Sequence, residues 1–332
     1  MATTIAQSGV PQAQPQRKRL MEVGVQTLGI GMFYILILLF FSFASAEFFT
    51  YSNSVNILTN VSVIGIVALG QALAIISGGF DLSVSGVVPL GAVTFALLTN
   101  AGLNVPLAII VVIAVGGLVG LANGLIVTKL GINPLITTLG TLSIGVGTAY
   151  SLSSGVTIPL AHPSAGVLAN QAWAGVSYYL IAFIVLSIIT FLMLRFTVFG
   201  RMLYAVGGNR EASRLAGMRV DLVTNLVYIQ CAALAAFAGV VVTSQLLAGS
   251  ATVGADAALT SIAAVVLGGA SLTGGVGGIP GTLIGVLVLG TIANGMALLQ
   301  VPAFYQQIAT GVILLLGVGF ARLRETVSGD RA

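Results

Sequence analysis

The sequence predicts an all-α integral membrane protein, a polytopic bundle of about ten transmembrane helices. Of its 332 residues, 57% are hydrophobic and only 6% are charged, whereas soluble domains carry roughly 25% charged residues. Ten apolar runs follow one another, and none shows the alternation of polar and apolar residues that membrane strands require. Because only helices and closed barrels satisfy their backbone groups in lipid, we expect each run to be a helix.

The first apolar run, residues 23–46, follows a basic cluster at residues 17–19. The cluster, the run and Ala44-Ser45-Ala46 together imitate a secretory signal with its cleavage site. The run is longer than the roughly 7–15 residues of a signal core and close to the ~20 residues that cross a bilayer. We therefore expect an uncleaved first span.

The remaining runs complete a transmembrane domain over residues 23–321, between tails at 1–22 and 322–332. The third and eighth runs are shorter than a plain crossing requires, so we expect them to be tilted, broken or only partly inserted. The ten expected spans are residues 23–46, 55–77, 84–98, 105–127, 134–151, 176–196, 222–247, 257–267, 280–299 and 305–321.

Ten crossings from a cytoplasmic N-terminus place every basic residue on the cytoplasmic side, as the positive-inside rule requires. The long loop with His162 and Trp173 then lies outside, without Lys or Arg. Five spans on each side of this loop suggest two inverted five-helix halves. The glycine-rich segments 78–86 and 268–278 are the expected equivalent breaks, although their separation does not match a half-chain offset.

Glycine spacing indicates close helix packing within the bundle. Gly116, Gly120 and Gly124 are four residues apart, and so are Gly281 and Gly285. Small residues at this spacing let two helix backbones approach in lipid. The pattern supports a compact bundle and does not indicate a particular function.

The sequence carries no set of catalytic or metal-binding groups. Cys231 and His162 are the only residues of their kinds, which excludes a disulfide framework and leaves no cluster for a metal. The segment Gly269–Gly274 begins like a phosphate loop, but Gly275 and Val276 follow where Lys and Ser or Thr are required. We expect no ATPase site, metal or cofactor in this chain, and no nucleic-acid partner, because the net charge of +4 comes from tails and loops.

Few charged residues are available inside the membrane. Asp81 and Asp256 lie at the edges of apolar runs, where each carboxylate either caps the following helix or lines a pathway. Such a bundle suits a neutral, hydroxyl-rich solute, since a charged solute needs counter-charges that are costly in the membrane. The polar residues that either line such a path or form interhelical hydrogen bonds are Gln71, Asp81, Asn123, Asn133, Thr137, Thr138 and Asn294.

A charged segment interrupts the apolar pattern at residues 200–221, where six of the twenty Lys, Arg, Asp and Glu residues lie. Asn209 is suited to cap a short helix that stops at Gly217. Arg210 and Arg214 fall on one face of it, and Leu215 and Met218 are expected to supply apolar contacts. A solvated loop that only sets topology is the alternative. The cap, the stop and the mixed faces favour a cytoplasmic helix that docks another protein.

This segment resembles part of a known family. Glu211-Ala212-Ser213-x-x-x-Gly217 is similar to the loop, EAA-x-x-x-G, by which permeases of ATP-binding-cassette importers contact their ATPase. Residues 207–220, 78–86 and 262–278 resemble permeases for ribose and other simple sugars. The family often has Ala where Ser213 stands. The resemblance implies that ATPase coupling is carried by Asn209, Arg210, Glu211, Ala212, Arg214 and Gly217.

The resemblance also implies the partners and the location of the chain. It implies a ten-helix permease for a neutral monosaccharide, with a second permease copy and a separate ATPase subunit that binds ATP and Mg²⁺. An extracytoplasmic solute-binding protein would deliver the sugar. The location would be a bacterial plasma (inner) membrane, with multiple passes and both termini cytoplasmic. An ion-coupled secondary transporter and a branched-chain amino acid permease of the same importer class are the alternatives.

Overall fold

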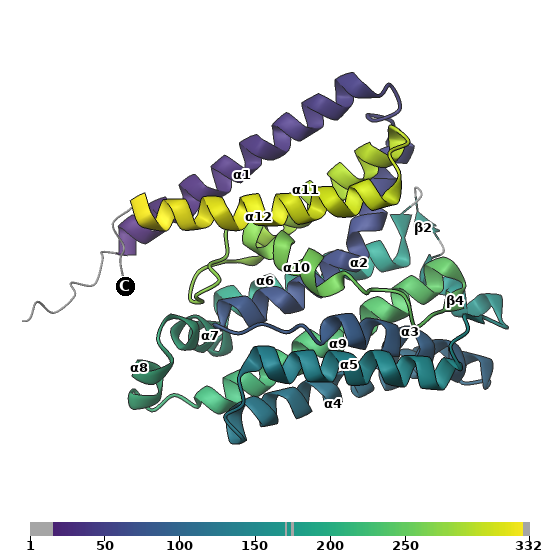
Figure 1. Cartoon of the computed structure of the whole chain (residues 1–332), viewed down its shortest axis with the longest axis horizontal. Coiled ribbons are helices and arrows are strands. Elements are labelled where there is room, and N and C mark those ends of the chain that lie inside the picture. The colour runs from purple at the N-terminus through teal and green to yellow at the C-terminus, as the bar shows by residue number, and fades with distance from the viewer. Residues whose placement is uncertain (1–15, 170, 174–175, 328–332) are drawn as a thin grey trace, which may run out of the picture.

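The computed structural model describes residues 16–169, 171–173 and 176–327, and most of these residues are helical (Figure 1). The longer helices are α1 (Gln16–Ala44), α2 (Tyr51–Ile76), α3 (Val84–Asn100), α4 (Val105–Lys129), α5 (Pro134–Ser153), α6 (Tyr178–Phe196), α9 (Val220–Leu246), α10 (Ala257–Leu267), α11 (Ile279–Leu298) and α12 (Ala303–Val327). The short elements are α7 (Val198–Gly208), α8 (Arg210–Leu215), the 3-10 helix η1 (Pro163–Ala169) and the strands β1 (Ile158–Pro159), β2 (Gln171–Trp173), β3 (Val176–Ser177) and β4 (Ala248–Gly249).

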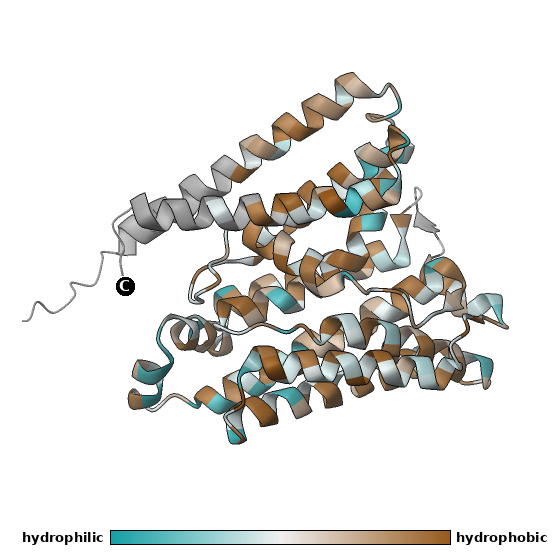
Figure 2. Cartoon of the chain, viewed as in Figure 1, coloured by the Kyte–Doolittle hydropathy of each residue, from teal (hydrophilic) through white to brown (hydrophobic). Residues whose placement is uncertain are grey.

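Each of the ten expected spans coincides with one of the longer helices. Within the described residues, six of them are long and apolar enough to cross a membrane: α2, α4, α5, α6, α9 and α11. Helix α3 has 17 residues and α10 has 11, which confirms that the third and eighth runs are short. At 1.5 Å per residue α10 spans about 17 Å, roughly half of a bilayer core. Apolar residues cover the long helices, and polar ones gather at their ends and on α8 (Figure 2).

Polar caps set where several of these helices begin. Asn104 accepts a hydrogen bond from the backbone N–H of Leu107 at 3.0 Å, and Asn133 accepts one from Leu135 at 2.9 Å. Each Asn stands before a helix whose first turn contains proline, where the missing N–H costs nothing. These two caps fix short turns on either side of α4, so α3, α4 and α5 run as antiparallel neighbours.

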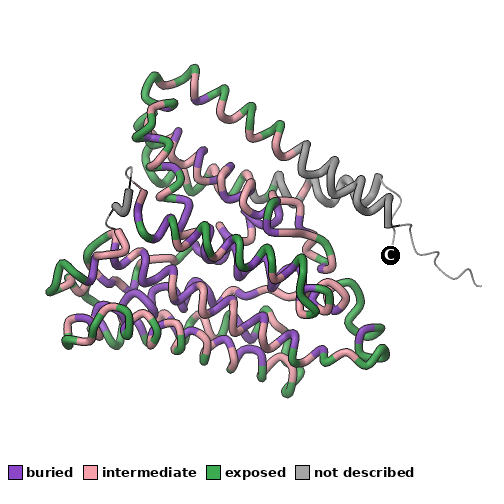
Figure 3. Tube along the Cα trace, turned by 180° about the vertical axis from the view of Figure 1, so that it is seen from behind, coloured by how far each residue is buried: buried purple, intermediate pink, exposed green. Residues whose placement is uncertain are grey.

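Helices α2 and α9 form the centre of the bundle. Helix α9 packs against α2, α3 and α4, whereas α2 also contacts α6, α10 and α11. Helices α1, α11 and α12 lie along one side, and α3, α4, α5 and α9 along the other (Figure 1). Buried residues are concentrated in the inner helices, and exposed ones on the outer helices and loops (Figure 3). The second half of α2, from Gly65 to Ile76, is entirely buried.

The glycine spacing does allow close packing, as the sequence predicts. A Cβ atom on Gly116 would lie 2.6 Å from the Ala232 carbonyl oxygen, and one on Gly124 would lie 2.8 Å from the Asn225 Cα, both on α9. Cβ atoms on Gly281 and Gly285 of α11 would collide with carbonyl oxygens of Gly268 and Ala264. The glycines therefore hold α4 against α9 and α11 against α10.

The pairing of the two glycine-rich segments as equivalent breaks is wrong. Residues 77–83 separate the second and third long helices, but residues 268–278 separate the eighth and ninth. In two five-helix halves, the break equivalent to residues 77–83 would separate the seventh and eighth long helices. That break is residues 247–256, between α9 and α10. The glycine-rich segments instead touch each other, since a Cβ on Gly274 would lie 2.7 Å from the Gly78 Cα. Glycine marks both segments because their backbones meet.

Candidate functional site: the α8 helix and its connection to the bundle

The predicted cap and stop of the charged segment are both present around α8. Asn209 Oδ1 accepts a hydrogen bond from the Ala212 N–H at 2.8 Å. After the helix, Gly217 has a φ of 78°, and the Met218 N–H donates to the Ser213 carbonyl at 3.0 Å. This closure satisfies carbonyls at the helix end and needs a residue that tolerates left-handed backbone. The segment is thus an ordered helix, which the solvated-loop alternative does not predict.

Helix α8 turns its charged side chains and one large apolar side chain to the surface. The Glu211 and Arg214 side chains are 70% and 56% exposed, and Leu215 is 82% exposed. Leu215 was expected to supply an apolar contact, but it packs little against its own chain, whereas Met218 does pack against the core. Ser213 is buried, so the departure from the family's Ala faces the chain rather than the surface.

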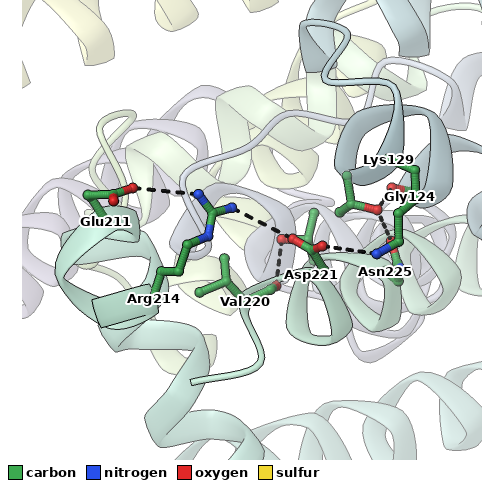
Figure 4. A network of polar contacts seen from close by, with 9 residues as sticks. Gly124, Lys129, Glu211, Arg214, Val220, Asp221 and Asn225 are labelled. Carbon is green, nitrogen blue, oxygen red and sulfur yellow. Dashed lines mark hydrogen bonds and ion pairs between the residues drawn. The ribbon is translucent and has the colours of Figure 1, made fainter. Parts of the chain in front are cut away.

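A chain of ion pairs links α8 to the ends of two long helices (Figure 4). Arg214 lies 3.5 Å from the Glu211 carboxylate and 3.9 Å from that of Asp221 at the start of α9. Asp221 also pairs with Lys129, at the end of α4, at 3.2 Å. Each exposed pair contributes only about 0–1 kcal/mol, so the chain orients α8 more than it stabilises the fold. The 92-residue separation of Lys129 and Asp221 hid this link from sequence reasoning.

Helix α7 joins α8 to a contact of four glycines, Gly78, Gly207, Gly274 and Gly275, which we call the glycine junction. A Cβ on Gly207 would collide with the Ile76 carbonyl oxygen and lie 2.8 Å from the Gly275 nitrogen. Gly78, Gly274 and Gly275 have positive φ, which strongly favours glycine. The junction thereby fixes α7, and α8 after it, to the end of α2.

Tyr204 makes a second contact between α7 and the 268–278 segment. Its hydroxyl donates a hydrogen bond to the Gly277 carbonyl at 2.9 Å. Burial raises the pKa of the Tyr204 phenol above its ordinary value, so the hydroxyl keeps the proton that it donates. A tyrosine inside an apolar stretch gave no sequence signal for this contact.

Asp81 lies at the centre of a buried polar network in the break between α2 and α3. Its carboxylate accepts from the Ser83 N–H at 3.0 Å and from the Ser83 hydroxyl. Asn123 of α4 donates to the Ser83 hydroxyl oxygen at 2.9 Å, and Thr141 of α5 donates to Asn123 at 2.5 Å. Helix α3 begins at Val84, as expected, and Ser83 holds its N-cap position without a side-chain cap hydrogen bond within the described residues. Asp81 closes the turn before the helix through Ser83 rather than capping the helix itself, so the capping prediction for Asp81 is wrong.

Four of the predicted pathway residues share one further property. Within the described residues, a buried polar atom on each lacks a hydrogen-bond partner: Gln71 Nε2, Asp81 Oδ2, Thr137 Oγ1 and Asn294 Oδ1. Such an atom costs about 1–3 kcal/mol and calls for an explanation in a folded protein. A structural role alone does not explain why all four atoms are left unpaired.

The predicted pathway residues do not form a single cluster. Gln71 approaches the Cys231 sulfur at 3.9 Å, and Thr137 joins the Asp81 network through Thr141, which donates to its carbonyl at 3.0 Å. Asn294 of α11 instead donates to Asn53 near the start of α2, at 3.0 Å. Asn133 caps α5, and the Thr138 hydroxyl donates to the Pro134 carbonyl at 2.9 Å.

Asp256 does not behave as the predicted cap. It precedes α10, yet within the described residues its side chain accepts no hydrogen bond from the first turn of that helix. Within the described residues, the one hydrogen bond of its carboxylate is with the Thr260 hydroxyl, at 3.4 Å. The residue is exposed, so its carboxylate is free for another partner.

In the described part of the chain, no group of three or more His, Cys, Asp or Glu side chains comes together. His162 lies exposed in the outer loop, and Cys231 is buried in α9.

Comparisons with known proteins agree on a transport role. A family model described as "Branched-chain amino acid transport system / permease component" matches residues 53–318. The chain is 36% identical to the ribose import permease protein RbsC of Bacillus subtilis (strain 168), over 92% of this chain and 96% of that protein. It is also 36% identical to the L-arabinose ABC transporter permease protein AraH of Azospirillum brasilense, over 89% and 87%. No solved structure matches the chain.

Proposed function

The chain belongs to the family of branched-chain amino acid transport system / permease components, and from this membership we propose that it forms the translocation pathway of an ATP-binding-cassette importer for a neutral monosaccharide. A multi-pass protein of the bacterial inner membrane fits its apolar helices and its relatives. In this proposal both termini are cytoplasmic, a second permease copy completes the pathway, and a binding protein delivers sugar from outside.

The observation that carries the proposal is the exposed, rigid helix α8. Its cap and glycine stop order it, and the glycine junction and ion pairs fix it to α2, α4 and α9. Beside it lies a recess of about 450 Å³ lined by Lys129, Arg214, Arg219 and Asp221, among others. A helix with exposed Leu215 and charged neighbours suits a protein contact. We propose that the ATPase docks here through Asn209, Arg210, Glu211, Ala212, Arg214 and Gly217, with ATP and Mg²⁺ bound on that partner.

The glycine junction offers a mechanical route from this contact to the membrane. Helix α7 meets the end of α2 there, and the Asp81 network begins five residues after that end. Backbone contacts without intervening side chains transmit displacement with little compliance, because packed interiors are dense. In the proposal, movement of α8 on ATP binding shifts α7 and the α2–α3 break together, and Gln71, Asp81, Asn123, Asn133, Thr137 and Asn294 are retained as pathway residues.

The choice of a neutral sugar rests on chemistry and on the relatives. Charged residues that could neutralise an ionic solute are scarce. Asp81 and Asp256 are the only acidic residues in two long stretches of the sequence, residues 48–210 and 222–321. A hydroxyl-rich solute needs only amide, hydroxyl and carboxylate partners. The named relatives transport ribose and L-arabinose. The family description keeps a branched-chain amino acid permease as the second candidate.

Charge reversal on α8 tests the docking role. In the complex of permease, ATPase and binding protein, a Glu211→Lys, Arg214→Glu variant is expected to lose most of its ATP-driven uptake. The reason is that both side chains are exposed and meet the partner directly. The measurements are recovery of the ATPase subunit with tagged permease and the ratio of sugar imported to ATP hydrolysed.

A matched control is Glu47→Lys, which reverses an exposed charge in the turn between α1 and α2. It should leave both measurements unchanged. The docking claim would be contradicted if the double variant retained the ATPase subunit, and imported sugar per ATP hydrolysed, as the wild type does. Uptake by the permease alone, driven by an ion gradient, would instead establish a secondary transporter.

A further inference from the structure

A recess of about 240 Å³ lies where the N-terminal part of α10 meets α2, α3 and α9, and we call it the outer pocket. Five of its lining residues have branched aliphatic side chains: Val63, Ile64, Val67, Val88 and Val242. Its polar residues are Asn60 of α2, Asp256 just before α10, and Thr260 of α10. From this arrangement we propose that the outer pocket is a subsite that binds one monosaccharide during transport. The inference rests on the proposed function and adds the place and the residues of sugar recognition.

The three polar side chains are placed to bind hydroxyl groups. Asn60 is exposed, and its side-chain amide forms no hydrogen bond within the described part of the chain. Asp256 has only the 3.4 Å contact with Thr260, because it does not cap α10. A carboxylate accepts two hydrogen bonds and an amide both donates and accepts, so this set can bind adjacent hydroxyls on a sugar ring. Within the described residues, the Asn60 amide makes no hydrogen bond and the Asp256 carboxylate makes only the one with Thr260, so most of their hydrogen-bonding capacity is available to a ligand.

The size and charge of the outer pocket select the class of solute. Pockets for drug-sized ligands measure roughly 300–1,000 Å³, so about 240 Å³ suits a single ring rather than an oligosaccharide. Asp256 is the one charged residue of the lining, and no Lys or Arg faces it. A solute with a carboxylate or phosphate would therefore meet repulsion and find no counter-charge. The aliphatic walls can pack against the C–H faces of a neutral sugar.

The position of the outer pocket fits an early step of import. Asn60 precedes Ile76, at the glycine junction, by 16 residues of α2, which is about 24 Å of helix. The pocket is thus far from α8, towards the end of the bundle where β4 pairs with β1 of the long loop (Figure 1). Residues 60, 64, 67 and 71 recur at helical spacing and share one face of α2. That face leads from the outer pocket to Gln71, whose amide nitrogen is buried without a partner.

The loop that carries Asp256 is firmly seated on α3. Gly254 has a φ of 72°, and a Cβ there would lie 2.5 Å from the Val88 Cγ1. Backbone approach of this kind fixes the position of the two residues that follow. The Asp256 carboxylate is consequently held at the pocket rather than left on a free loop.

The test compares sugars that differ by one hydroxyl in the complete importer, reconstituted with its ATPase and binding protein. Uptake of D-ribose is measured against its 2-deoxy, 3-deoxy and 5-deoxy analogues. At least one analogue should enter about tenfold more slowly than ribose in the wild type, since a lost hydrogen bond to a charged group costs that much or more. In the Asp256→Ala or Asn60→Leu importer, the ratio of the ribose uptake rate to the rate for that analogue, the hydroxyl penalty, should fall to about twofold. The binding protein is the same throughout, so its own selectivity cancels in the comparison.

Two further measurements keep the outcome clear. Thr252→Val alters an exposed residue of the same loop, outside the pocket, whose hydroxyl contacts Ser250 at 2.9 Å, and it should keep the wild-type penalty. ATP hydrolysis stimulated by the binding protein should persist in Asp256→Ala, which shows that the complex assembles. An unchanged hydroxyl penalty in both Asp256→Ala and Asn60→Leu would overturn the subsite. A wild-type importer that carries leucine and no pentose would overturn the proposed function itself.

Discussion

Gly207 is the residue on which the link between α8 and the membrane domain depends most. A side chain there has no space, because the Ile76 carbonyl and the Gly275 nitrogen lie against its Cα. Gly208, the next residue of α7, has open space where a Cβ atom would lie, with nothing within 4 Å of that position. Gly208 also touches the junction, since a Cβ on Gly275 would lie 2.8 Å from the Gly208 Cα, but a side chain added to Gly208 would point away from it into open space.

A Gly207→Ala variant is expected to lose stability by about 1–3 kcal/mol, the usual cost of overpacking, and to lose most of its ATP-driven uptake. The control Gly208→Ala should be neutral or slightly stabilising, because alanine is the better helix former by about 1 kcal/mol. Uptake and ATP hydrolysis measured on the assembled importer check both expectations. Equal behaviour of the two variants would contradict the role given to the junction.

Residue-scale prediction succeeded where chemistry is local in sequence. The Asn209 cap and the Gly217 stop follow from their types and spacing, since both act within a few residues. The links Lys129–Asp221 and Tyr204–Gly277 join residues 92 and 73 positions apart, and only the fold brings these together. Asp256 misled sequence reasoning because a carboxylate before a helix usually caps it, whereas here the geometry leaves it free.

At the scale of elements, the contact between α4 and α9 shows how the glycine pattern stabilises the bundle. Gly120 of α4 lies against the Tyr228 carbonyl and the Ile229 Cα of α9. A Cβ atom on Gly117, one turn earlier, would lie 3.8 Å from the nearest atom of Ile229, which is an ordinary contact. Alanine substitutions at these two positions therefore distinguish the effect of helix propensity from the effect of close contact between the helix backbones.

Gly120→Ala is expected to lower the free energy of unfolding by about 1–3 kcal/mol, because the added methyl group separates the helices. Gly117→Ala should be neutral or stabilising. The buried Cys231 is the chain's one thiol, so a thiol-reactive fluorophore reports unfolding during heating in detergent. Equal melting temperatures for the two variants would show that close packing at Gly120 contributes nothing.

The elements themselves were largely predictable from the sequence. Apolar runs gave the ten helices, and their lengths gave the short α3 and α10, because lipid imposes a minimum length on any crossing. Glycine content did not predict which helix breaks are equivalent in the two five-helix halves. Glycine marks both a helix break and a close backbone contact, and the sequence alone does not distinguish these two uses.

At the scale of the whole molecule, the proposed function requires a connection between the exposed helix α8 and the membrane-spanning helices, and the glycine junction supplies it. Helix α8 lies at one end of the bundle, the outer pocket lies towards the other, and α2 connects them. In the proposed function, the energy source is a partner's ATP hydrolysis, and the solute path runs through this chain. The absence of a phosphate loop in the sequence is consistent with this division of labour.

The most direct test of this account is the energy requirement of uptake in sealed proteoliposomes that contain the permease, its ATPase and the binding protein. With ATP and Mg²⁺ supplied on the ATPase side, labelled ribose should accumulate against its gradient, and removal of ATP or of the ATPase subunit should abolish accumulation. A proton or sodium gradient without ATP should have no effect. Accumulation driven by such a gradient in vesicles that hold the permease alone would contradict the account.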